Sequence, residues 1–414
     1  MMQPLYIVSS IYKKKMFMKN FIHCIVLFCA MLFPFFGNTQ LDTKHYIPPM
    51  FGREDLGDHY LVLSTNETIA FDVIIKDGAG NIIGIETISS ANSTSFSLGS
   101  GTATEFLVQE SELNTIVTNK GLVLEANRPF FANIRVIAGA QGGSLTSKGV
   151  KAALGKDFRA GFLYNNIGYA NGKSNTIGIM ATENGTTVTI DDIRPGVVFH
   201  GTTPIGVPLT SPIQTVTLNA GECYVVAAYL DNADATENVN GVNGTRITSD
   251  KNIVVNCGSW LGGNAIVAGV VSGGRDLGID QIVPVDIIGS EYVAIKGEGI
   301  DNEKIIVVAT EDFTTLVLNG TGVVVATLNA GDYYLIDGTE FSANENLLIN
   351  NDINIKDTQV LADLLLATKK IAKQMNVDKE GYRIVINCNK NAGQTVYHLH
   401  LHLIGGRKLN WPPG

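Results

Sequence analysis

Cysteine is scarce in this sequence, and the few cysteines present are widely spaced. Five occur in 414 residues, and no two of them form a Cys-x-x-Cys pair. A zinc site built on cysteine thiolates is therefore not expected. Cys24 and Cys29 fall in an apolar N-terminal run, which leaves Cys223, Cys257 and Cys388. Two interpretations stay open for Cys223 and Cys257: a disulfide formed after export or, as favoured, two small buried apolar side chains.

Concentrated positive charge is also missing. The net charge is −9, and no basic patch or long run of one sign stands out. Nucleic-acid binding through phosphate contacts is therefore not expected. His45, His59 and His200 lie far apart in the sequence without a serine or cysteine nucleophile motif, so we assign them no site. The hydrophobic share of 45 % indicates a folded chain, and the length suggests roughly two to four domains.

Long apolar runs are missing except near the N-terminus. There the basic segment "KKKMFMKN" precedes "FIHCIVLFCAMLFPFF", which extends from Phe21 to Phe36 and contains Pro34. This run is short for a membrane span, and the pattern is typical of a signal peptide. We therefore predict a signal peptide region over 1–40, a secreted or cell-surface location, and no transmembrane segment beyond the signal.

The region from about Gln40 to Asn350 has the pattern of an all-β protein. Short runs rich in β-branched residues, such as "TIAFDVII", "TTVTI" and "TTLVL", are separated by Asn-Gly and similar turns. Parts of the region repeat. The matches are "ATENGTTVTI" (181–190) with "ATEDFTTLVL" (309–318), "TLNAGECYVV" (217–226) with "TLNAGDYYLI" (327–336), and "SDKNIVVN" (249–256) with "SANENLLIN" (342–350).

A weaker first copy begins at "STNETIAFDV" (64–73) and continues to "EANRPFFANI" (125–134). We therefore predict three related β-modules, sandwich-like or propeller-like, packed along one another.

The β-rich region resembles a known family of extracellular domains. The segments that carry the resemblance are "LDTKHYIPPMFGR" (41–53), "FLVQESELNTIVTNKGLVLEANRPFFANIRV" (106–136) and "ITSDKNIVVNCGSWLGG" (247–263). They are similar to the N-terminal domain family named for IgGFc-binding protein, over about 41–350. The resemblance implies adhesion to, or binding of, an extracellular protein or glycan, without catalysis.

The C-terminal part differs from the β-rich region in charge and in side-chain periodicity. From Asp357 onward there are eight Lys or Arg against four Asp or Glu, in a chain whose net charge is −9. The segment 357–375 has helical apolar periodicity, with Asp357 as the expected N-cap and lysines toward its C-terminal half. The residues predicted to share one apolar face are Val360, Leu361, Leu364, Leu365, Thr368, Ile371, Ala372 and Met375. Segments 382–388 and 394–404 are predicted to form a β-hairpin. We thus expect a partial α+β fold of one helix and one hairpin after the β-modules.

Three of the seven histidines stand at alternate positions in "GQTVYHLHLHLIGG" (393–406). Successive side chains of a strand point to opposite faces, so His398, His400 and His402 should share one face. Such a row can bind a metal ion, form a nucleophilic site, or lie on an ordinary surface strand. The spacing alone leaves these alternatives open.

The wider segment "GYRIVINCNKNAGQTVYHLHLHLIGGRKLNWPPG" (381–414) resembles the C-terminal half of histidine triad (HIT) proteins, specifically the nucleoside phosphoramidate hydrolases. The resemblance implies that His400 attacks the α-phosphate of a purine nucleotide conjugate or phosphoramidate and forms a nucleotidyl-histidine. His402 would contact phosphate, and His398 would orient the site. This chemistry requires no metal and no cofactor.

The same resemblance assigns the remaining site residues. Asn387 and Gly393 would contact phosphate, and Thr395 would help protonate the leaving group. Thr395 stands where the family usually has serine, so its extra methyl group is expected to alter the rate. Trp411 would shape the leaving-group side across a dimer interface, which implies a dimer formed through the tail.

The HIT-like part is short. The resemblance covers only about 350–414, and nothing upstream matches the preceding half, which supplies the nucleoside pocket in that family. HIT proteins are also normally cytosolic, whereas this chain begins with an export signal. We therefore predict a truncated HIT domain at 351–414 after a β-region at 41–350. Either the tail is an active hydrolase, or the chain is a non-catalytic binding protein with an inert half domain from a gene fusion.

Overall fold

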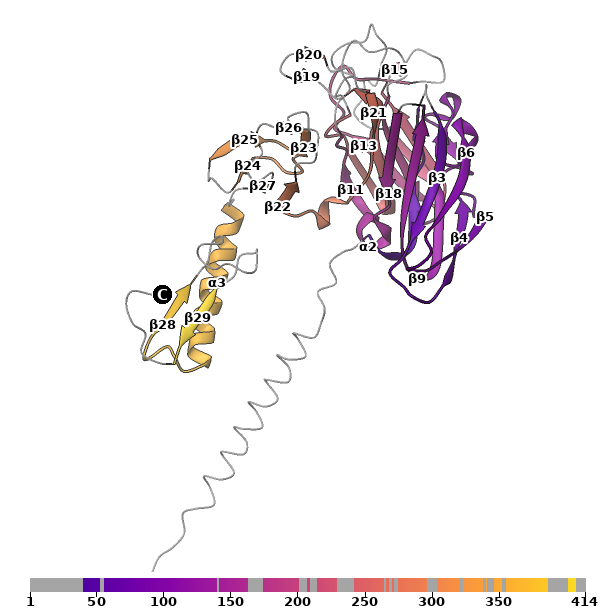
Figure 1. The fold of residues 1–414 in the computed structure, drawn as a ribbon. Coiled ribbons are helices and arrows are strands. Elements are labelled where there is room, and N and C mark those ends of the chain that lie inside the picture. The colour runs from indigo at the N-terminus through magenta and orange to yellow at the C-terminus, as the bar shows by residue number, and fades with distance from the viewer. Residues whose placement is uncertain are drawn as a thin grey trace, which may run out of the picture.

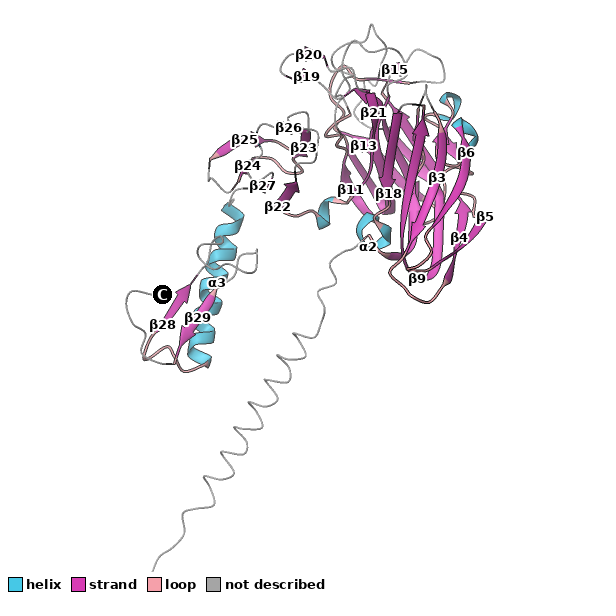
Figure 2. Cartoon of the chain, in the orientation of Figure 1, coloured by secondary structure: helices cyan, strands magenta, loops and turns pink. Residues whose placement is uncertain are grey.

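The computed structural model of the protein is mostly β-strand, as the sequence predicts (Figures 1 and 2). The structure describes residues 40–52, 56–139, 141–162, 174–200, 207–208, 214–228, 242–263, 266–267, 270–271, 275–295, 304–319, 323–337, 340, 346–351, 355–385 and 401–406. The predicted signal peptide lies almost entirely outside these residues.

The first β-module is built around one long strand, β9 (Leu122–Ala138). Its other strands are β1 (Asp42–Ile47), β3 (Asp58–Ser64), β4 (Phe71–Asp77), β5 (Ile82–Ile88), β6 (Thr94–Ser100) and β10 (Gln141–Thr146). The first half of β9 pairs with β1 and β4, and its second half pairs with β3 and β10. β5 extends the first half through β4, and β6 extends the second half through β3.

Alternation along these strands turns one face of each half inward. Val73 and Ile75 of β4 and Leu61 and Leu63 of β3 are fully buried in one shared core. Because the two halves meet face to face over that core, the module is sandwich-like.

The second β-module repeats this arrangement around β18 (Arg246–Gly263). Its other strands are β11 (Gly155–Arg159), β12 (Ser174–Ala181), β13 (Thr186–Asp191), β16 (Gln214–Leu218), β17 (Cys223–Ala227) and β21 (Arg275–Ile282). β11 and β13 pair with the first half of β18, whereas β12 and β21 pair with its second half. β16 and β17 extend the two halves as β5 and β6 do in the first module.

The third β-module is smaller. Its strands are β22 (Glu291–Ile295), β23 (Lys304–Val308), β24 (Thr314–Leu318), β25 (Val324–Leu328), β26 (Tyr333–Asp337) and β27 (Asn346–Asn351). They form one four-stranded sheet, β22-β27-β24-β25, and a separate hairpin, β23-β26. The strand pairing corrects one of the repeat alignments. The sequence match aligns Asn350 with Asn256. In the structure, Asn351 lies opposite Leu316 as Ser249 lies opposite Val188, so Asn351 is equivalent to Ser249.

Short elements join these strands. They are β2 (Met50–Phe51), β7 (Leu107–Val108), β8 (Ile116–Val117), β14 (Val198–Phe199), β15 (Val207–Pro208), β19 (Ile266–Val267), β20 (Val270–Val271), the helix α2 (Gly149–Ala153) and the 3₁₀ turns η1 (Gly101–Ala103), η2 (Glu110–Glu112) and η4 (Val285–Ile287).

Pairs of glycines mark the junctions between modules. Gly221 and Gly331 occupy the same place in the repeated "NAG" turns, and each lies against a glycine of the preceding module. A Cβ atom on Gly221 would lie 2.0 Å from the carbonyl oxygen of Gly78, and one on Gly244 would lie 1.9 Å from that of Gly331. The backbones therefore approach too closely for any side chain.

A buried polar seam, defined as His45, Ser147, Asn256 and Gln281, joins the first two modules. The Gln281 amide donates to the Tyr46 carbonyl at 2.7 Å and accepts from the Lys148 backbone N–H at 2.6 Å. Asn256 donates to the Pro48 carbonyl at 2.6 Å. The Ser147 hydroxyl lies within hydrogen-bond distance of both His45 Nδ1 and Gln281 Oε1. All four residues are fully buried, so these contacts replace water.

The C-terminal part consists of α3 (Ile355–Gln374), β28 (Tyr382–Val385) and β29 (His402–Gly405). The helix begins two residues earlier than predicted, so Asp357 lies in its first turn and is not its N-cap. A Schellman-type turn ends the helix: Asn376 has a φ of 56°, and the Val377 N–H donates to the Ala372 carbonyl at 3.0 Å.

Candidate functional sites

The described residues place the end of the histidine row in a hairpin. β28 and β29 pair antiparallel, with His402 opposite Val385 and Leu403 opposite Ile384. Within the described residues, the strands predicted at 382–388 and 394–404 pair over 382–385 and 402–405.

Most of the predicted catalytic residues lie outside the described part of the chain. These are His398, His400, Asn387, Gly393, Thr395 and Trp411; for His402 only the strand is described. The roles assigned to these residues therefore stay predictions.

The apolar side of helix α3 is only partly buried. Thr368 and Ala372 are buried, as the predicted apolar face requires, but three members of that face, Leu365, Ile371 and Met375, are 47–67 % exposed. Leu366, outside it, is also exposed. A helix packed on a complete sheet would cover most of such a face.

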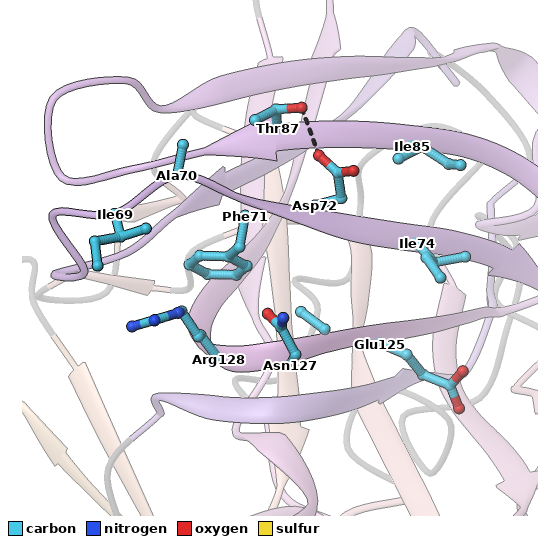
Figure 3. Close-up of a pocket in the computed structure, with 11 residues that line it drawn as sticks. Ile69, Ala70, Phe71, Asp72, Ile74, Ile85, Thr87, Glu125, Asn127 and Arg128 are labelled. Atoms are coloured by element: carbon cyan, nitrogen blue, oxygen red, sulfur yellow. Dashed lines mark hydrogen bonds between the residues drawn. The ribbon is translucent and has the colours of Figure 1, made fainter.

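An open surface on the first module was not foreseen from the sequence (Figure 3). It is a shallow cavity of about 780 Å³ on the outer side of β4, β5 and the bend of β9. Ile74 lies opposite Ile85, and Asp72 lies opposite Thr87, whose hydroxyl donates to the Asp72 carboxylate at 2.6 Å. Ile85 is 56 % exposed. Isoleucines at outward positions of β4 and β5 are the signal that the sequence offered.

Charged pairs frame this open surface. The Glu125 carboxylate accepts from Lys44 at 2.7 Å and from Lys76 at 2.5 Å, and these hydrogen bonds hold its pKa below the ordinary value. Arg128 pairs with Glu67 at 2.6 Å. Glu125 and Arg128 thus have partners of opposite charge within the module, and the Asp72 carboxylate accepts from the Thr87 hydroxyl. The exposed isoleucines beside them form an apolar area suited to contact another apolar surface.

Three histidines of the β-region are buried in structural positions. His45 Nε2 donates to the Phe130 carbonyl at 3.0 Å, and His59 Nε2 donates to the Leu56 carbonyl at 2.8 Å. Burial lowers the pKa of both rings. His200 Nδ1 lies 3.3 Å from a Glu110 carboxylate oxygen. Each ring therefore helps to fix strands and loops in the core.

The two described cysteines are free and buried, as favoured from the sequence, and form no disulfide. Burial raises the pKa of the Cys257 thiol to about 12 and that of Cys223 well above its ordinary value. Among the described residues, no group of three His, Cys, Asp or Glu side chains could hold a metal ion. Within the same part of the chain, no helix is both long and apolar enough to cross a bilayer.

Comparison with known proteins decides the family of the β-region. The sequence profile described as "IgGFc binding protein" matches residues 142–380, more than half of the chain. The chain belongs to the IgGFc binding protein family. The match begins within β10, covers the second and third modules of this family member and continues through α3, whereas the other strands of the first module precede it.

The chain is also similar to HIT proteins over a shorter stretch. It is 51 % identical over 67 residues to an uncharacterised HIT-like protein of Buchnera aphidicola subsp. Baizongia pistaciae, covering 16 % of this chain and 60 % of that protein. It is 60 % identical over 55 residues to an uncharacterised HIT-like protein of Synechococcus elongatus, with coverages of 13 % and 47 %.

A third relative is a "14 kDa zinc-binding protein" of Brassica juncea, 56 % identical over 55 residues that cover 13 % of this chain and 48 % of that protein. The chain thus spans about half the length of these relatives. A solved HIT family hydrolase from Legionella pneumophila is 28 % identical, with coverages of 31 % and 91 % and a TM-score of 0.15.

Proposed function

We propose that this chain is an exported binding protein whose β-modules recognise an extracellular protein. The observation that carries this proposal is the family match over the second and third modules. The basic segment and apolar run at 13–36 support export. The open surface of the first module supplies an apolar contact area with satisfied charges around it.

Binding to immobilised immunoglobulin Fc tests the ligand that the family description names. We expect Ile85→Lys to weaken binding, because it places a charge in the apolar centre of the open surface. Val324→Lys is the matched control: Val324 is 43 % exposed, and it lies on β25, the strand of the third module that corresponds to β5. No binding by the folded protein would argue against Fc as the ligand. Equal losses in both variants would argue against the open surface.

The C-terminal part supports a second function, nucleotide hydrolysis at His400. The similarity to HIT-like proteins and the β28–β29 register favour it. In this proposal His400 attacks the α-phosphate, His402 contacts phosphate, His398 orients the ring, and Thr395 helps to protonate the leaving group. Asn387 and Gly393 would hold phosphate, and Trp411 would line the leaving-group side.

AMP release from adenosine phosphoramidate by the full chain tests this second function. We expect turnover that is lost in His400→Ala and kept in Met375→Ala, a change on the exposed face of α3. Because the chain spans only about half of its HIT-like relatives, we expect inorganic phosphate to compete nearly as well as adenosine monophosphate. No turnover by the wild-type protein would contradict the hydrolase proposal.

Metal analysis of the purified protein separates hydrolysis from metal binding at the same histidines. One relative is described as zinc-binding. One zinc ion per chain, lost in His400→Ala, would favour a metal site on the histidine row over a nucleophile.

A further inference from the structure

The two complete modules are built in the same way: one long strand takes part in both sheets of the sandwich. The second half of β18 lies between β12 and β21, with Ile253 opposite Ala181 and Trp260 opposite Ser174. The second half of β9 lies likewise between β3 and β10. Each module is closed by this second half-strand.

Within the described residues, the third module contains only the first half of that strand. Ile349 of β27 lies opposite Tyr292 and Leu318, as Ile247 of β18 lies opposite Phe158 and Ile190. The neighbouring sequences "GKDFRA" (155–160) and "GSEYVA" (289–294) agree with this equivalence.

Because Ile349 is equivalent to Ile247, the residues equivalent to the second half-strand 253–260 are 355–362. Those residues are not in a strand, because α3 begins at Ile355. Within the described residues, β23 therefore pairs with β26 on one edge and with no strand on the other.

Side-chain burial reflects the missing half-strand. Ile177 and Ile179 of β12 are fully buried, whereas their equivalents Ile305 and Val307 of β23 are only half-buried. A cavity of about 420 Å³ runs beside β23 and is lined by four consecutive residues of it, 305–308. Tyr292 and Ala294 of β22 contribute further apolar lining.

The other wall of this cavity belongs mainly to the second module and is nearly neutral. Lys148 and Asp280 line it as an ion pair at 2.6 Å, and Arg159, also in the lining, pairs with Asp192 at 2.7 Å. An occupant therefore needs no charge of its own. Its backbone would find the unpaired edge of β23, and its side chains would find apolar walls.

We propose that the edge of β23 accepts an extended segment from another polypeptide, which adds as an antiparallel strand and closes the third module. The complete modules define the chemistry of that segment. The half-strands in the equivalent place are "FFANIRVIA" (130–138) and "IVVNCGSW" (253–260). The segment is thus apolar, rich in β-branched and small residues, nearly uncharged and free of proline.

A labelled peptide with the sequence 252–260, carrying serine at the cysteine, tests the proposal on the full chain. We expect saturable binding and slower hydrogen exchange in β23. A peptide with the same side chains but alternate N-methylated amides, or the variant Ile306→Lys, should bind about tenfold or more weakly, because strand addition needs backbone hydrogen bonds and an apolar wall. The variant Val324→Lys should bind the unmodified peptide normally.

Three results would overturn the proposal: equal binding of the N-methylated peptide, no binding of either peptide, or β23 amides that are already as protected in the free protein as those of β12. Sedimentation of the protein with and without the peptide tests whether a second copy supplies the segment. A dimer that the peptide dissociates would identify a second copy as the donor of the segment.

Discussion

Replacement of Gln281 by leucine should measure what the buried polar seam contributes to stability. Gln281 is fully buried and bonds to two backbone groups, the Lys148 N–H and the Tyr46 carbonyl, at 2.6 and 2.7 Å. Leucine is similar in size but offers neither a donor nor an acceptor. Each backbone group left without a partner costs about 1–3 kcal/mol when buried. Because both bonds are only partly buried, we expect a total loss of about 2–4 kcal/mol.

Urea unfolding followed by tryptophan fluorescence would detect this loss, since Trp260 is fully buried in the core beside the seam. Hydrogen exchange in β1, β10 and β21 should accelerate in parallel, because the seam joins these strands. Gln374→Leu, at an exposed position on α3, is the matched control. A loss in Gln281→Leu below about 0.5 kcal/mol, the range of ordinary surface substitutions, would refute a stabilising role for the seam.

Three further predictions follow from buried groups and close contacts. Burial lowers the pKa of the His45 and His59 rings, so the folded protein favours their neutral forms. Their stabilising contribution is therefore present above the ordinary pKa of 6.5 and is lost as the pH falls. Urea midpoints that stay constant from neutral to acidic pH would contradict this. Gly80→Ala should destabilise the protein by about 1–2 kcal/mol, because an alanine would have to adopt a left-handed φ. Gly244→Ala should cost more, because Gly244, unlike Gly80, also lies against another backbone segment. Equal protease sensitivity and thermal midpoints of the two variants would argue against tight junctions. Cys223 should stay unlabelled by thiol reagents until the chain unfolds, because burial raises its pKa and hides it from solvent; peptide mapping of labelled native protein checks this.

Local patterns predicted the elements of this protein well. β-branched runs between Asn-Gly turns indicated the strands, and the repeats "ATENGTTVTI" and "ATEDFTTLVL" end in β13 and β24 at equivalent places. The helix was predicted within two residues of its observed bounds. These successes rest on side-chain periodicity and turn chemistry, which act within a few residues.

The candidate functional residues were only partly predictable from such patterns. The histidine row is a local motif, so the sequence displays it directly. The open surface on β4, β5 and β9 depends on which outward side chains remain uncovered, and the burial of His45 depends on Ser147 and Phe130, far away in the chain. Contacts of that kind leave no local trace.

The sequence by itself determined the β-repeat, the separate helix and hairpin, and the alternate spacing of the three histidines. Only the tertiary structure decided that each complete module is a sandwich joined by one long strand, and that the third module stops after half of it. The reason is that strand pairing is non-local: β23 has the composition of a central strand, and whether a neighbour covers its second edge depends on residues some fifty positions further along the chain, where the sequence changes from strand to helix.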